Sequence, residues 1–164
     1  MKFVSIVIAS KSDYGVMVEC TETFKKFGVP YELVVSSGHK SPERTKTYIQ
    51  TAEAKGAQVF ITAAGMAAHL AGTVAANTTK PVLGVPMESG ALKGEDALLS
   101  TVMMSEGMPV GTLAIGKAGA VNAAYLAIQI MALHDDELQV KLQEDRISKA
   151  KKVELDSSEI ETIL

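Results

Sequence analysis

Short apolar, β-branched runs alternate with helical stretches along most of this chain, and the alternation is the strongest constraint on its fold. The expected strands are residues 3–9, 31–35, 59–63, 81–85 and 111–115. The expected helices are residues 14–27, 43–55, 67–77, 96–104 and 118–133. Strands that alternate with helices of this length form right-handed βαβ units around a parallel sheet. We therefore predict an α/β fold, a three-layer sandwich with a central five-stranded parallel sheet of the flavodoxin-like or Rossmann-like kind.

The length of 164 residues indicates one domain, and a hydrophobic fraction of 47% excludes a disordered chain. We expect residues 1–134 to form the α/β catalytic part. Residues 135–164 are rich in charge and are expected to form a C-terminal helix, which frays into a tail from residue 153, as part of the same domain. This helix is either a solvated surface helix or an arm that reaches over a neighbouring subunit.

Charge and cysteine content exclude several classes of protein. A net charge of −3 gives no basic surface for nucleic acid. The single cysteine, Cys20, excludes a disulfide framework and a four-cysteine zinc site. The apolar start runs into Lys11 and is too short for a signal peptide, while residues 118–133 fall short of the ~20 apolar residues that span a bilayer. We expect a cytoplasmic protein that binds neither nucleic acid nor membrane.

Charged residues are scarce in the second half of the predicted sandwich. Only seven of the 35 charged residues lie between residues 56 and 134, and none lies in residues 118–133. An ordinary surface helix carries a polar face. We therefore expect the helix at 118–133 to be covered by other subunits, which predicts a homo-oligomer.

Polar side chains follow the first predicted strand, at the edge of the sheet where α/β proteins bind ligands. Ser10 and Ser12 offer hydroxyl groups, and Asp13 opens the following helix. The backbone amides and hydroxyls suit a phosphate, and the carboxylate suits ribose hydroxyls. The alternative is that these side chains only cap the helix.

A histidine and a lysine lie side by side after the second predicted strand. Ser37, His39 and Lys40 precede Ser41 and Pro42, which are typical of a helix start. His39 can transfer a proton near neutral pH, and Lys40 can neutralise a phosphate. This loop is the strongest single indication of a catalytic site.

Small residues dominate the loop after the third predicted strand. The candidate substrate-binding residues here are Gly65, Ala67, His69 and Leu70. Small side chains let the backbone approach a flat ligand closely. His69 falls on a predicted apolar helix, where it is either a core or interface residue or a ligand contact.

Other nucleotide and metal templates are absent from the sequence. There is no G-x-x-x-x-G-K-[ST] phosphate loop, no G-x-G-x-x-G dinucleotide motif and no G-x-S-x-G nucleophile elbow. The three histidines share no metal-ligand spacing with Cys20 or with a carboxylate pair. We therefore expect no metal site.

Four motifs together resemble one enzyme family. They are S-K-S-D at residues 10–13, S-G-H-K-S-P at 37–42, A-A-H-L-A-G at 67–72 and P-V-G-T-L-A-I-G-K-A-G-A-V-N-A-A at 109–124. The combination resembles the N5-carboxyaminoimidazole ribonucleotide mutase (PurE) family of de novo purine biosynthesis. The similarity extends over residues 3–142.

The resemblance implies isomerisation of N5-carboxyaminoimidazole ribonucleotide to the 4-carboxy isomer, without metal or organic cofactor, by an octamer. The implied route releases carbon dioxide and aminoimidazole ribonucleotide (AIR) within the site, after which ring carbon C4 attacks the carbon dioxide. The implied catalytic residue is His39, which removes the C4 proton. The implied nucleotide contacts are Ser10, Asp13 and Lys40, and the implied phosphate contacts are Ser12 and Ser37.

The chain departs from the family pattern at four positions near these motifs. Ala9, Lys40, Met66 and Ala71 stand where the family usually has Gly, Arg, Gly and Pro. Lysine cannot form the bidentate phosphate contact of arginine. A lysine beside the histidine also resembles the related AIR carboxylases, which use carbon dioxide directly. Direct carboxylation is therefore one alternative function, and a non-catalytic nucleotide-binding paralogue is another.

Overall fold

The central sheet has five strands, all parallel. The computed structural model describes residues 1–163. The strands are β1 (Phe3–Ile8), β2 (Tyr31–Val35), β3 (Ala57–Gly65), β4 (Val82–Met87) and β5 (Gly111–Thr112). Their order is β2-β1-β3-β4-β5, which is the order of flavodoxin-like folds. The predicted α/β sandwich with a five-stranded parallel sheet is confirmed.

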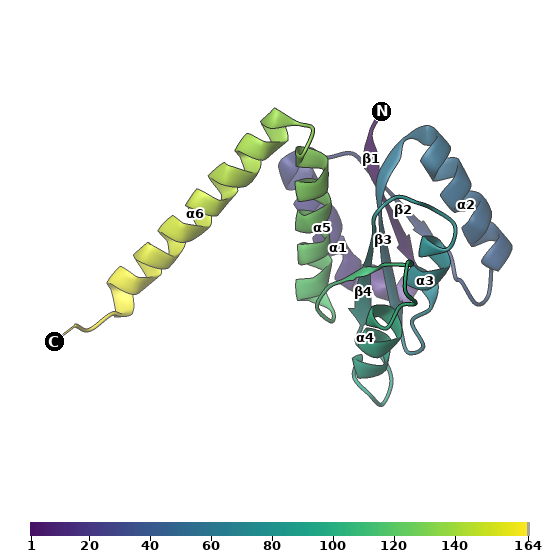
Figure 1. Ribbon diagram of the computed structural model, residues 1–164. Coiled ribbons are helices and arrows are strands. Elements are labelled where there is room, and N and C mark those ends of the chain that lie inside the picture. The colour runs from purple at the N-terminus through teal and green to yellow at the C-terminus, as the bar shows by residue number, and fades with distance from the viewer. Residues whose placement is uncertain (164) are drawn as a thin grey trace. The chain divides into compact units, whose positions relative to one another are not determined.

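Helices cover both faces of this sheet (Figure 1). They are η1 (Lys11–Asp13), α1 (Tyr14–Phe27), α2 (Pro42–Lys55), α3 (Leu70–Ala75), α4 (Glu95–Val102) and α5 (Lys117–Ala132). The last helix of the described residues is α6 (Asp136–Ile160). α1 and α5 lie together on one face, where Phe27 meets Tyr125 edge to face at 5.4 Å and Lys117 pairs with Glu19 at 2.7 Å. α2, α3 and α4 lie on the other face.

β1 lies in the middle of the core, and all six of its side chains are buried. Phe3 and Val7 belong to a cluster with Ile49 of α2 and Val74 of α3. Since alternate strand residues point to opposite faces, Val4, Ile6 and Ile8 point toward α1 and α5. Burial on both faces explains why five of the six strand residues are apolar; the sixth is Ser5.

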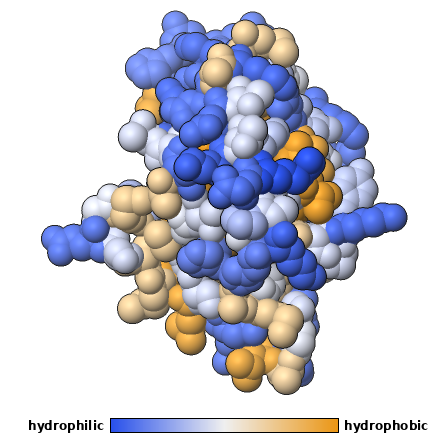
Figure 2. All heavy atoms as spheres, turned by 90° about the vertical axis from the view of Figure 1, so that its right-hand side faces the viewer, coloured by the Kyte–Doolittle hydropathy of each residue, from blue (hydrophilic) through white to orange (hydrophobic). Residues whose placement is uncertain are grey.

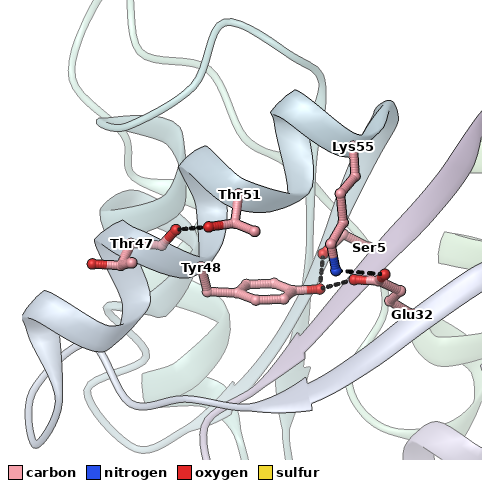
Figure 3. Close-up of polar contacts among 6 residues, drawn as sticks. All are labelled: Ser5, Glu32, Thr47, Tyr48, Thr51 and Lys55. Carbon is pink, nitrogen blue, oxygen red and sulfur yellow. Dashed lines mark hydrogen bonds and ion pairs between the residues drawn. The ribbon is translucent and has the colours of Figure 1, made fainter.

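That serine belongs to a polar network between the sheet and α2 (Figure 3). The Ser5 and Tyr48 hydroxyl oxygens lie 2.9 Å apart, and the Tyr48 hydroxyl donates to Glu32 at 3.3 Å. The Lys55 ammonium donates to the other Glu32 oxygen at 3.2 Å. Burial raises the pKa of Tyr48, and the Ser5 hydrogen bond opposes that rise. The network fixes α2 against β1 and β2.

Several element boundaries differ from the sequence-based predictions. β5 has only two residues instead of five, and α3 begins at Leu70 instead of residue 67 because a tight turn at Met66 precedes it. α6 continues to Ile160, through most of the segment expected to fray. Its N-terminus is capped by Asp135, whose carboxylate accepts the Leu138 amide at 3.0 Å. At its other end the Glu161 amide donates to the Ser157 carbonyl at 2.8 Å.

The chain forms two compact units, residues 1–128 and residues 129–164. The first contains the whole sheet, and the second contains α6. The expected division of one domain at residue 134 stays a prediction. Within residues 1–163, no helix combines the length and the apolar character needed to cross a membrane.

Candidate active site

Three loops meet at the carboxyl ends of β2, β1 and β3, which are neighbours in the sheet. Between them is a cavity of about 50 Å³, lined by Ala9, Ser37, Gly38, His39, Ala64, Gly65, Ala67, His69 and Leu70. Six of the predicted site residues therefore come together here. The other four, Ser10, Ser12, Asp13 and Lys40, do not line the cavity. The lining residues Ala9, Gly38 and Ala64 were not predicted, and the only signal for them was their small size beside predicted residues.

His39 and His69 stack face to face at the rim of this cavity. Their ring centroids are 5.6 Å apart and their planes differ by 10°. Both residues are exposed. His69 is the residue before the first turn of α3, so the expectation that it lies on a helix is wrong. Its imidazole lies outside the helix and against that of His39.

The turn that carries His39 is closed by two serines. The Ser41 amide and hydroxyl both donate to the Ser37 carbonyl, at 2.9 Å and 3.1 Å. The Ser37 amide donates back to the Ser41 hydroxyl at 3.0 Å, and the Ser37 hydroxyl accepts the Lys40 amide at 3.1 Å. The Ser41 side chain therefore holds the turn and makes no capping bond to α2.

A buried hydroxyl pair anchors this turn from below. The Ser36 and Thr45 hydroxyl oxygens are 2.7 Å apart, and the Thr45 hydroxyl donates to the Ser41 carbonyl at 3.1 Å. Because the single Thr45 proton is used in that second bond, Ser36 is the donor to Thr45. Sequence reasoning missed both residues, because serine and threonine are common on the surface and their sequence pattern does not indicate burial.

The loop after β1 is held by reciprocal capping bonds. The Ser10 amide donates to the Asp13 carboxylate at 3.0 Å, and the Ser12 amide donates to the Ser10 hydroxyl at 3.3 Å. Burial raises the pKa of Asp13, while the Ser10 amide acts to lower it. Ser10 and Ser12 nevertheless remain exposed. The capping role is therefore present, and the predicted role in ligand binding stays a prediction.

Close backbone packing explains the glycine at the end of β3. Gly65 pairs with Met87 in the sheet, and a Cβ on Gly65 would lie 2.9 Å from the Ser89 Cβ. The loop after β4 therefore rests directly on the loop that forms the cavity. A side chain at this position would separate the two loops.

A larger cavity of about 980 Å³ lies at the opposite, amino end of β4. Its lining includes Glu53, Lys80 and Met108 but no histidine and no predicted site residue. Ligands of open parallel sheets bind at the carboxyl ends of the strands. We therefore assign the site to the smaller cavity. Among residues 1–163, no group of three or more His, Cys, Asp or Glu side chains is placed to hold a metal ion.

The fold and the site together define a flavodoxin-like α/β protein with a stacked histidine pair at the ligand-binding edge of its sheet. Residues 3–152 match the family model described as AIR carboxylase. The chain belongs to this family, as the sequence motifs predicted.

Named relatives agree with this assignment. The N5-carboxyaminoimidazole ribonucleotide mutase of Escherichia coli K12 is 52% identical over 143 residues, which cover 87% of this chain and 85% of that protein. The protein of the same name from Bacillus subtilis is 47% identical over 156 residues, 95% of this chain and 96% of that protein. The crystal structure of Treponema denticola PurE has a TM-score of 0.89 at 27% identity and covers 99% of this chain and 100% of its own. Membership of their family confirms that this chain is an enzyme.

Proposed function

We propose that this chain isomerises N5-carboxyaminoimidazole ribonucleotide to the 4-carboxy isomer, the reaction for which its relatives are named. The observation that carries the proposal is the histidine pair, His39 and His69, at the rim of a cavity of about 50 Å³ lined by small residues. A space of that size suits a molecule as small as carbon dioxide and is far too small for the nucleotide.

The proposed reaction has two steps and consumes no second substrate. The bond between N5 and the carboxylate carbon breaks, the nitrogen takes up a proton, and carbon dioxide remains in the cavity. The electron-rich ring carbon C4 then attacks the carbon dioxide, and His39 removes the C4 proton. The nitrogen takes up one proton and C4 releases one. His39 therefore returns to its starting state if it donates a proton to the nitrogen and accepts the proton from C4. Trapping the carbon dioxide beside C4 supplies a high effective concentration.

The exposed polar groups around the cavity support nucleotide binding there. Ser10, Ser12 and Lys40 are exposed on the same edge of the sheet, and Ser37 lines the cavity itself. We propose that the hydroxyls and the lysine hold the phosphate, while Asp13 contacts the ribose. The Gly65–Leu70 segment would then face the aminoimidazole ring.

Two parallel assays test the reaction. One contains N5-carboxyaminoimidazole ribonucleotide, and the other contains AIR with bicarbonate and dissolved carbon dioxide, with absorbance of the 4-carboxy product followed in both. We expect fast turnover only in the first. Fast turnover in the second at low carbon dioxide would establish a direct carboxylase instead. If neither assay forms the 4-carboxy product and the protein is folded, the result would favour a nucleotide-binding protein without catalysis.

The role of His39 is tested by His39→Asn. We expect a rate at least about 100-fold lower with unchanged folding, because a general base contributes about that much. His134→Asn is the matched control, since His134 is also exposed but lies far along the chain from the site loops. An active His39→Asn enzyme would exclude the proposed proton transfer.

We also propose that the working form is a cytoplasmic homo-oligomer, specifically an octamer. Five alanines of α5 are already buried in the single chain, namely Ala120, Ala123, Ala124, Ala127 and Ala132, whereas apolar residues in and after α4 are exposed. Leu99 is 60% exposed and Met103 is 78% exposed, on the outer side of α4 and just after it. Figure 2 shows apolar side chains gathered at the lower end of that face, at the level of α4 in Figure 1. Light scattering would give the mass, and a monomer would refute the proposal.

A further inference from the structure

Met66 adopts a backbone conformation that its residue type disfavours. Its φ is +57°, in the left-handed region, where a Cβ collides with the backbone. The Ala68 amide donates to the Met66 carbonyl at 2.8 Å and closes a tight turn directly after β3. Such a conformation persists only where the surroundings fix it, and it is concentrated at functional sites.

Core packing does not account for a methionine at this position. Met66 is 58% exposed, so burial gives it little stabilisation. Glycine would adopt the same turn without strain. The backbone is fixed on both sides of Met66, because Gly65 is paired in the sheet and Ala68 is buried. The side chain is therefore held outward at a conformational cost that the fold itself does not require.

Met66 lies beside the candidate active site. Gly65 and Ala67, its two neighbours in the chain, both line the cavity shared with His39 and His69. A Cβ built on Gly90 would lie 4.0 Å from the Met66 Cγ, so the side chain extends toward the loop after β4. An unbranched apolar group thus lies between two loops beside the cavity.

We propose that Met66 covers the cavity when the nucleotide is bound and limits the escape of carbon dioxide. This inference rests on the proposed isomerisation. Carbon dioxide carries no charge and no proton to donate, so its retention depends on steric closure more than on polar contacts. A flexible thioether can pack over an irregular opening and exclude water. Met66 is a positioning residue in this account, since it makes and breaks no bond.

Escape of the intermediate has a measurable consequence. Carbon dioxide that leaves before C4 attacks it exchanges with carbon dioxide in solution, and the remaining AIR either leaves or captures a new molecule. With ¹³C-labelled bicarbonate in solution and unlabelled substrate, the ¹³C content of the 4-carboxy product reports this exchange. A sample without enzyme gives the correction for spontaneous decarboxylation.

Three variants distinguish the effect of the Met66 side chain from the effect of the strained backbone. Met66→Ala removes the cover and keeps the strained backbone, Met66→Gly removes both, and Met66→Leu keeps apolar bulk as the matched control. We expect several-fold higher ¹³C incorporation in the alanine and glycine variants and wild-type incorporation in the leucine variant. We also expect Met66→Gly to melt at a higher temperature than Met66→Ala, because glycine relieves the strain.

The outcomes distinguish this inference from the proposed reaction. A wild-type enzyme without isomerase activity would refute the reaction itself. An active wild type, with the same ¹³C incorporation in Met66→Ala and Met66→Gly, would overturn the role of Met66 alone. A change in assembly mass in Met66→Ala, measured by light scattering, would also overturn it, because the side chain would then act as a subunit contact.

Discussion

The buried hydroxyl pair of Ser36 and Thr45, behind the turn that carries His39, leads to a quantitative prediction about the free energy of unfolding. Thr45 is 0% exposed and Ser36 is 2% exposed, and the Ser36 hydroxyl donates to Thr45. Thr45→Val keeps the shape of the side chain but leaves the Ser36 donor unpaired and removes the bond to the Ser41 carbonyl. A lost hydrogen bond costs about 1 kcal/mol and an unpaired buried group about 1–3 kcal/mol, so we expect a loss of about 2–4 kcal/mol.

Ser36→Ala is expected to cost less, about 1 kcal/mol, because Thr45 still donates its proton to Ser41. The double variant has no unpaired donor. We therefore expect the free energy of unfolding of Ser36→Ala/Thr45→Val to be equal to or above that of Thr45→Val alone. This is the pattern of a directly coupled pair.

Urea denaturation of the three variants and the wild type measures these differences, provided that the slope with denaturant is unchanged. Steady-state kinetics of Ser36→Ala, the milder variant, then reports on the turn itself. We expect kcat to fall more than KM rises, because His39, the proposed base, is displaced while the proposed nucleotide contacts remain. A double variant that loses the full sum of the two single losses would refute the assigned donor.

Three further predictions concern the core. Burial raises the pKa of the Cys20 thiol from 9.0 to about 12, so the folded state resists ionisation and stability is lost as the pH rises above 9. Between pH 9 and 10.5 the wild type should lose about 1.5–2 kcal/mol more than Cys20→Ala in urea unfolding, and parallel losses would contradict this. Gly84→Ala should cost about 1–3 kcal/mol because its Cβ meets the Thr101 methyl group, and Thr101→Ser in the same chain should restore part of the melting temperature. Tyr48→Phe should cost about 1–3 kcal/mol by leaving the fully buried Ser5 hydroxyl unpaired, whereas Ser5→Ala/Tyr48→Phe should cost less than the two single losses together.

The sheet could be predicted from the sequence because its signal is local. The run Phe3–Ile8 is apolar on both faces, as a central parallel strand must be, and the following turn residues mark its end. Six of the nine residues of the cavity could be predicted because parallel strands bring their carboxyl ends to one edge. The predicted binding roles of Ser10 and Lys40 rest on family resemblance and await experiment.

The details that sequence reasoning missed depend on tertiary contacts. The late start of α3 follows from the left-handed turn at Met66, which a methionine does not signal. His69 therefore lies before the helix instead of on it, and its ring stacks on that of His39. β5 ends after Thr112 although the next residues are apolar and the Leu113 amide still donates to the Gly84 carbonyl of β4. The burial of Ser36 and Thr45 is decided by the packing of α2 on the sheet.

The strand order has a consequence for the order in which the enzyme is assembled during synthesis. β1 is made first, but it lies between β2 and β3 and pairs with both. Its hydrogen bonding therefore stays incomplete until residue 65 has left the ribosome, and such distant pairing is slow. The three loops of the site all come from the first 70 residues. These three loops can therefore come together as soon as β3 docks, and the later helices then fix them in place.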